Sequence, residues 1–224
     1  MNPINDLDTQ LAKLADEVAT YGPRSVPTEL RRRHVLVAAA LEFVAHGFAD
    51  ATMQQIAARA GVTKPVVYGL FDSKDDLFVA VVDQTSNEMA DRLAAATPRP
   101  GESHLGAGIR AFLHYVDERR ALWGPLTDSS HHGAVAAALT RFQDRQVEFV
   151  TAALAEGYRE RGVEPGAAEV EALARVVSGA ATSMAEWMHR RPEVGPDEAA
   201  AFVDAALNPG LDAVRGADQP RWFS

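Results

Sequence analysis

The chain has 224 residues and no cysteine, which excludes disulfide bonds and thiolate metal sites. Hydrophobic residues make up 47% of the sequence, enough to bury a core, and no apolar run approaches the roughly 20 residues that span a bilayer. The net charge of −9 disfavours a nucleic-acid surface over the whole chain, and the acidic N-terminus disfavours a secretory signal. We therefore expect a cytoplasmic globular protein.

Charge is unevenly distributed along the chain. From Arg24 to Lys74 there are seven basic residues and four acidic ones, which leaves a net charge of −12 on the rest. Because phosphate binding requires cations, a basic N-terminal segment on an acidic body favours a DNA-binding domain joined to a domain that does not bind DNA.

The first predicted element is a short amphipathic helix at residues 5–20. Its apolar residues recur at helical spacing, at Leu7, Leu11, Leu14 and Val18. Two prolines and a glycine in the following segment break it. We interpret residues 1–27 as an N-terminal extension whose helix is a packing or interaction element, with a contact to DNA as the alternative.

A second helix is expected to begin at Thr28, whose hydroxyl suits an N-cap. Gly47 would end this helix in the left-handed conformation, with Phe48 folding back on the last turn. The T-x-x-Q pattern of Thr52 and Gln55 then predicts a capping box at the start of a third helix, which ends near residue 60.

A tight turn and a fourth helix follow. Gly61 supplies the turn, and Thr63 caps a helix that reaches about residue 70 and has Pro65 in its first turn. Two short helices joined in this way predict a helix-turn-helix, whose second helix enters the major groove of DNA.

The rest of the chain keeps a helical periodicity. Ser73 and Asp76 form an S-x-x-D cap that opens a longer helix. Strand-like alternation is absent over any useful length, so the predicted fold class is all-α. Further helices are expected at residues 102–120, 134–161, 165–190 and 196–215, with a looser stretch at 122–133 and a frayed tail at 216–224.

The candidate DNA contacts are outward residues of the fourth helix, hydroxyls at helix starts, and nearby cations. They are Arg31, Thr52, Thr63, Lys64, Pro65, Val66, Tyr68, Gly69 and Lys74. For the run of three arginines at residues 31–33, a solvated helix start is the favoured interpretation, and a phosphate or minor-groove contact, shared with Arg24, is the alternative.

Residues 29–82 resemble the DNA-binding domain of the TetR family of bacterial one-component regulators. Order and spacing agree along a string of residues that starts at His46-Gly47-Phe48. It continues through Ala60-Gly61-Val62-Thr63-Lys64 and Val67-Tyr68 to Ser73-Lys74-Asp75-Asp76-Leu77. Pro65 and Gly69-Leu70 depart from the residues that are usual in the family, so the resemblance does not imply an operator sequence.

The resemblance implies a three-helix DNA-binding domain at residues 28–74 and a helical ligand-binding and dimerisation domain at residues 75–215. A homodimer would place two copies of the helix at residues 63–70 in successive major grooves, roughly 34–36 Å apart, on a palindromic operator. Most members repress transcription until a small molecule binds. An activator or a regulator without a ligand is the alternative.

The dimer is expected to form through the helices near 165–190 and 196–215. Their predicted contact residues are Val170, Leu173, Val176, Val177, Ala180, Ala199, Phe202, Val203, Ala206 and Leu207. The ligand is expected to be apolar or amphipathic, because few strongly charged residues are candidates for its pocket. Those candidates are His114, Tyr115, Trp123, Arg145, Phe149 and Trp187.

Two other functions are disfavoured. An all-helical enzyme is a remote alternative, because the sequence lacks a nucleophile elbow, an H-E-x-x-H motif and a P-loop. Asp128 with His131-His132 suggests a metal, but a fourth ligand is not evident, so we expect neither a metal nor another cofactor.

Overall fold

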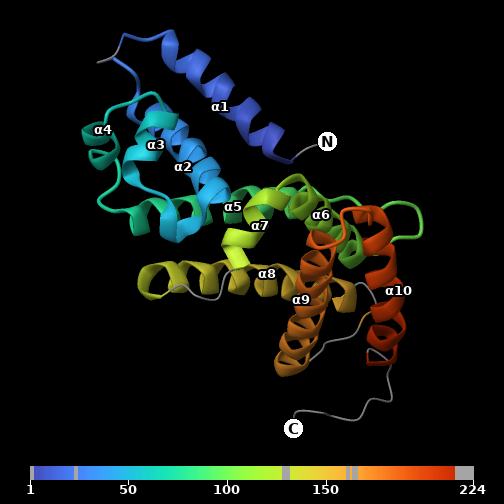
Figure 1. Cartoon of the computed structure of the whole chain (residues 1–224). Coiled ribbons are helices and arrows are strands. Elements are labelled where there is room, and N and C mark those ends of the chain that lie inside the picture. Colours follow the sequence, from blue (N-terminus) through green and yellow to red (C-terminus); the bar gives the residue numbers. More distant parts are fainter. Residues whose placement is uncertain (1–2, 23–24, 128–131, 160–161, 163–165, 215–224) are drawn as a thin grey trace. The chain divides into compact units, whose positions relative to one another are not determined.

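The computed structural model describes residues 3–22, 25–127, 132–159, 162 and 166–214, and within these ranges every regular element is a helix (Figure 1). The helices are α1 (Pro3–Ala19), α2 (Thr28–Asp50), α3 (Met53–Arg59), α4 (Lys64–Tyr68), α5 (Lys74–Ala94), α6 (His104–Glu118), α7 (Arg120–Thr127), α8 (Gly133–Arg159), α9 (Ala167–His189) and α10 (Pro196–Val214). None of these helices has the length and hydrophobicity that a membrane crossing requires. The predicted tail at residues 216–224 lies outside the described residues.

Contacts divide the chain into two compact units. The first holds Met1–Thr85 and Glu118–Phe142, and the second holds Ser86–Asp117 and Gln143–Ser224. The helices α5 and α8 therefore have residues in both units. The predicted boundary after residue 74 does not coincide with this division, because residues 75–85 and 118–142 also belong to the first unit. Within that unit α7 packs against α2.

The N-terminal extension is a packing element of the first unit. Helix α1 lies along α2 (Figure 1). Its Leu7 and Leu14 are buried, and Leu11 and Val18 are half-buried, so the predicted amphipathic stripe faces the protein. Burying two leucines stabilises this packing by roughly 3–6 kcal/mol before the entropy of ordering α1 is counted. Arg24 lies outside the described residues.

The two ends of α2 differ in how well the sequence predicted them. Thr28 is not the N-cap: it is the first helical residue, because the Pro27 carbonyl already accepts the first helical hydrogen bond, from the Arg31 N–H at 3.0 Å. Gly47 has the predicted positive φ, 74°, but its ψ of 166° lies outside the left-handed helical region, and helical hydrogen bonding resumes after it. Phe48 folds back as expected, its ring centroid 5.9 Å from that of Phe43.

The stretch predicted to be loose at residues 122–133 begins as a helix instead. Helix α7 covers Arg120–Thr127, so that part of the prediction is wrong. Leu122 and Trp123 are buried in the first unit, and the Trp123 ring lies 6.3 Å from that of Phe142. Their burial outweighs the helix-breaking tendency of the Gly124-Pro125 pair.

In the second unit α9 and α10 pack side by side (Figure 1). Four of the residues predicted to face a partner chain point into the unit's own core, and the local pattern could not separate the two faces. They are Val170, Val177, Ala199 and Val203. Val176 and Phe202 are 58% and 66% exposed, which leaves an apolar strip on the outside of both helices.

Candidate nucleic-acid interface

The turn between α3 and α4 is set by local hydrogen bonds. Gly61 has φ of 62°, a conformation that side chains rarely adopt. The Val62 N–H donates to the Ala57 carbonyl at 3.0 Å and the Gly61 N–H to the Ala58 carbonyl at 3.1 Å, which together form a Schellman motif. This motif ends α3 and directs the chain into α4, so the predicted turn is confirmed.

Helix α4 has one buried face and one open face. Val67 is fully buried and anchors the helix, and Val66 is half-buried. The remaining candidate side chains of α4 and its flanking residues are exposed: they are Thr63, Lys64, Pro65, Tyr68 and Gly69. The helix ends at Tyr68 rather than near residue 70. Such a short helix with an exposed polar side is the shape that enters a major groove.

Lys64 and Tyr68 lie next to each other on the open face. They are four residues apart, and the Lys64 ammonium is 5.6 Å from the centroid of the Tyr68 ring. Tyr68 is 45% exposed, which is unusual for a large aromatic side chain. The pair therefore presents a cation and a phenolic hydroxyl to solvent, the two kinds of group that bind phosphate oxygens. Thr63 occupies the N-cap position without a capping hydrogen bond from its side chain.

Thr52 forms the capping box that the sequence predicted. Its hydroxyl accepts the Gln55 N–H at 3.2 Å, and the Gln55 side chain accepts the Thr52 N–H at 2.9 Å. The same hydroxyl donates to the Gln55 side-chain oxygen. For Thr52 to donate a hydrogen bond to a phosphate, its hydroxyl would therefore have to give up the hydrogen bond that it donates to Gln55.

Lys74 has a role that differs from the predicted one. Its ammonium donates to the carbonyls of Phe48, Ala49 and Ala51 at 2.7, 2.9 and 3.0 Å, and it lies 4.6 Å from the Phe48 ring centroid. All three of its N–H groups thus bind carbonyls of the last residues of α2 and of Ala51, the residue that follows it. In this conformation Lys74 keeps no donor for the predicted phosphate contact.

The three arginines at the start of α2 are in different environments. Arg32 donates to the Leu70 carbonyl at 3.1 Å, and its guanidinium lies 4.2 Å from the Phe71 ring centroid, so it holds α2 to the segment after α4. Arg31 is half-buried, and Arg33 is exposed. The sequence did not distinguish these roles, because the partners of Arg32 are 38 and 39 residues away.

A buried carboxylate braces α2 against α3. Glu42 is only 4% exposed, and it pairs with the Arg59 guanidinium and lies 3.1 Å from His46 Nδ1. His34, about two turns earlier on α2, is also buried, and burial lowers the pKa of its imidazole below the usual 6.5. These contacts fix the angle between the helices that carry the candidate site, and the sequence-based interpretation missed them.

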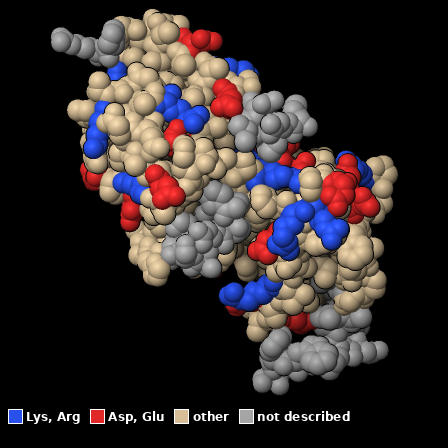
Figure 2. Space-filling view, viewed as in Figure 1, with Lys and Arg blue, Asp and Glu red and all other residues tan. Residues whose placement is uncertain are grey.

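Charges of both signs are interspersed on the face shown in Figure 2, and this face carries no continuous basic patch.

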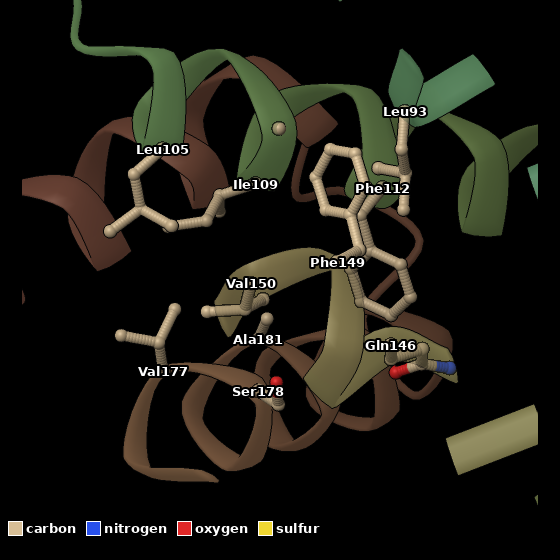
Figure 3. Close-up of a pocket in the computed structure, with 11 residues that line it drawn as sticks. Leu93, Leu105, Ile109, Phe112, Gln146, Phe149, Val150, Val177, Ser178 and Ala181 are labelled. Carbon is tan, nitrogen blue, oxygen red and sulfur yellow. The ribbon is translucent and has the colours of Figure 1, made fainter. Parts of the chain in front are cut away.

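A second candidate site is a small cavity in the second unit (Figure 3). It has a volume of about 30 Å³ and is lined by residues of α5, α6, α8 and α9. Most of its walls are apolar, and they include Leu105, Ile109, Phe112, Phe149 and Val177. Gln146 and Ser178 are the polar residues of its lining.

Only Phe149 of the predicted pocket residues lines this cavity. Trp123 belongs to the first unit, and Trp187 is 40% exposed under the Arg191 guanidinium. The other three pair outside the cavity: Tyr115 with Glu88, His114 with Asp197, and Arg145 with Ser86 and Asn87. The hydrogen bond from His114 lowers the pKa of Asp197, and both side chains of this pair are exposed.

Among the residues that the structure describes, no cluster of metal-binding side chains occurs. Asp128 and His131, which suggested a metal, lie outside those residues, and His132 is exposed.

Comparisons with known proteins agree with this geometry. Residues 35–81 match the model of the family described as bacterial regulatory proteins, tetR family. The HTH-type transcriptional activator FasR of Mycolicibacterium smegmatis is 36% identical over 94 residues, which are 41% of this chain and 43% of that protein. The HTH-type transcriptional regulator BetI 2 of Chromohalobacter salexigens is 27% identical over 53% of this chain and 60% of its own length. The chain thus spans about half the length of the curated relatives it matches.

A solved structure extends the likeness to most of the chain. It is a TetR-like transcriptional regulator from Rhodococcus sp. RHA1, with 27% identity and a TM-score of 0.65 over 86% of this chain and 99% of that one. The relatives are transcription regulators rather than enzymes, and the fold is a helix-turn-helix head with a helical C-terminal domain.

Proposed function

Because the chain belongs to the TetR family of bacterial regulatory proteins, we propose that it is a transcription regulator that binds a specific DNA sequence in the cytoplasm as a homodimer. The proposal rests mainly on α4, a short helix with Val67 fully buried on one side and Lys64 and Tyr68 exposed on the other. In this proposal α4 enters the major groove, and residues 28–74 form the DNA-binding domain.

The proposed DNA contacts fall into two classes. Lys64, Tyr68 and Thr63 bind phosphates, and their loss weakens binding to all sequences alike. Pro65, Val66 and Gly69 lie beside base edges, where the absence of large polar side chains favours contact with thymine methyl groups over hydrogen-bonded readout. Arg31 stays a proposed phosphate contact from α2.

The proposed dimer uses the exposed strip on α9 and α10. Val176 and Phe202 present apolar surface that is unusual on an isolated chain, and half-buried or exposed Leu173, Ala206 and Leu207 extend it. Packing two copies of this strip together forms a four-helix interface. A two-fold dimer reads two half-sites one helical turn apart, so the operator is palindromic or nearly so.

Regulation by a small molecule completes the proposal. The ligand occupies the second unit and favours a conformation in which the two heads no longer match successive grooves. A coupling of about 1–3 kcal/mol lowers the affinity for the operator by roughly 5- to 150-fold. In this form the protein is a repressor that the ligand releases.

An activator is the second candidate. The FasR relative, 36% identical over 94 residues, carries the name of a transcriptional activator. The DNA-binding geometry is the same in both cases, and the position of the operator relative to the promoter decides the sign of regulation.

The test is selection of bound duplexes from a randomised DNA library with the purified full chain. Recovery of one sequence with two inverted half-sites about 10–10.5 base pairs apart, or a multiple of that spacing, supports the proposal. Recovery of no shared sequence from a folded dimer refutes it. Reporter transcription with the selected operator upstream or downstream of a promoter then separates repressor from activator.

A further inference from the structure

We propose that the cavity in the second unit binds an uncharged, slender apolar molecule that bears a carbonyl group, held by hydrogen bonds from Ser178 and Gln146. The inference deepens the proposed function and rests on it for the regulatory role of the ligand. The binding chemistry itself follows from the cavity.

Ser178 is a polar side chain that the fold leaves without a partner. It is only 8% exposed, and its hydroxyl oxygen has no hydrogen-bond partner among the described residues. Burying an unsatisfied hydroxyl is costly, so a position that keeps one in an apolar core calls for a partner from elsewhere. Figure 3 shows the Ser178 oxygen at the α9 wall of the cavity.

Gln146 supplies a second donor. It is 8% exposed and lies at the α8 wall, and its side-chain oxygen is 3.5 Å from the Thr182 hydroxyl that donates to it. Figure 3 shows this oxygen on the cavity side of the Gln146 amide and the nitrogen on the far side, so the amide turns over to present its N–H groups to a ligand. Two buried donors that line one apolar cavity match a hydrogen-bond acceptor such as the carbonyl of an ester, thioester, amide or ketone.

The lining of the cavity disfavours charged ligands. None of its lining residues is Asp, Glu, Lys, Arg or His. An ionised carboxylate would lose its hydration there without gaining a counter-charge, which is far more costly than burying a neutral carbonyl. The ligand is therefore uncharged where it enters the cavity.

The Phe149 ring limits the volume of the cavity. A volume of about 30 Å³ holds one water-sized group, so a chain enters only when a wall moves. The half-buried Phe149 ring is the wall best placed to do so, because its edge lies 3.1 Å from where a side chain at Gly108 would begin. The ring lies against the backbone of α6 at Gly108, which has no side chain, and its rotation away opens the space between α6, α8 and α9.

The experiment is isothermal titration calorimetry of the full chain, without DNA, with two probes at pH 8: methyl octanoate and octanoate. We expect methyl octanoate to bind at least about tenfold more tightly than octanoate. Ser178→Ala is expected to weaken binding of the ester by about two- to tenfold, the loss of one net hydrogen bond. Ser183→Ala, an exposed serine on the same helix, is the matched control and leaves binding unchanged.

Phe149→Ala is the third variant, and it tightens binding of the ester because the space is already open. Equal or tighter binding of octanoate, or no binding of either probe by the folded chain, overturns the proposal even if Ser178→Ala fails to fold. An unchanged affinity in a folded Ser178→Ala variant overturns the role of the hydroxyl. Because no DNA is present, failure here is distinct from failure to bind an operator.

Discussion

Replacing Lys74 by methionine separates the structural role of this lysine from a contact with DNA. The substitution keeps a side chain of similar length and removes the three N–H groups that bind the carbonyls of Phe48, Ala49 and Ala51. The bonds to Phe48 and Ala51 are partly buried, and each contributes about 1 kcal/mol net. The cation–π contact with Phe48 adds about 0.5–1 kcal/mol, and the exposed bond to Ala49 adds little.

We therefore expect Lys74→Met to lower the free energy of unfolding by about 2–3 kcal/mol. The assay is urea unfolding followed by far-ultraviolet circular dichroism. Lys13→Met, at an exposed lysine of α1, is the control and should change stability by less than about 0.5 kcal/mol.

The same variant is then titrated with the selected operator over a range of salt concentrations, under conditions where it is folded. The slope of log affinity against log salt should stay unchanged for Lys74→Met and become shallower by about 1 for Lys64→Met. Unchanged stability together with a shallower slope for Lys74→Met would refute the structural role and return Lys74 to the phosphate contacts.

Three further predictions follow from single residues. Gly61→Ala should lower the free energy of unfolding by about 1 kcal/mol, because φ at this residue is 62°. Gly157→Ala should raise the free energy of unfolding by about 0.5–1 kcal/mol, because this residue lies inside α8 with open space where the new Cβ would stand. Thermal unfolding measures both changes. Burial lowers the pKa of His34 below 6.5, so the unfolded chain takes up that proton first as the pH falls. The stability that neutral His34 provides is thus complete above pH 6.5 and is lost as the pH drops through that value toward the lower folded-state pKa. We therefore expect the melting temperature of His34→Gln to fall less than that of the unmodified chain between about pH 7.5 and 5.5. Phe202→Glu places a charge on the proposed dimer strip and should shift the mass in sedimentation equilibrium from a dimer toward 24.1 kDa, with the far-ultraviolet spectrum retained.

Local signals in the sequence predicted the head well. Thr52 with Gln55 and Gly61 each act through bonds to neighbours within five residues, so their sequence pattern contains the whole cause of the structure. Thr28 was placed one residue too early in the helix because Pro27 can also occupy a cap, and its backbone already makes the first helical bond.

Roles that depend on distant partners were not predictable in the same way. Lys74 binds carbonyls 23 to 26 residues away, and Arg32 binds one 38 residues away, so neither pattern reveals whether the cation is free. Most of the pocket candidates lie away from the cavity for a related reason. Aromatic residues such as Trp123 and Trp187 show that a helix has an apolar face, but tertiary packing decides whether that face meets a core, a cavity or solvent.

Ser178 shows what sequence-based reasoning lacked in the second unit. A serine within an apolar helix is usually solvent-exposed or bonded to its own backbone. Its lack of a partner is visible only once α6, α8 and α9 are packed around it.

The most direct test of the central claim is a fluorescence-anisotropy titration of the full chain with its selected operator and with a scrambled duplex of the same composition. We expect binding at least about a thousandfold tighter to the operator at physiological salt. We also expect Lys64→Ala and Tyr68→Ala to weaken this binding while the protein stays folded and dimeric. Equal affinity for both duplexes, or full affinity in both variants, would contradict the placement of α4 in the major groove.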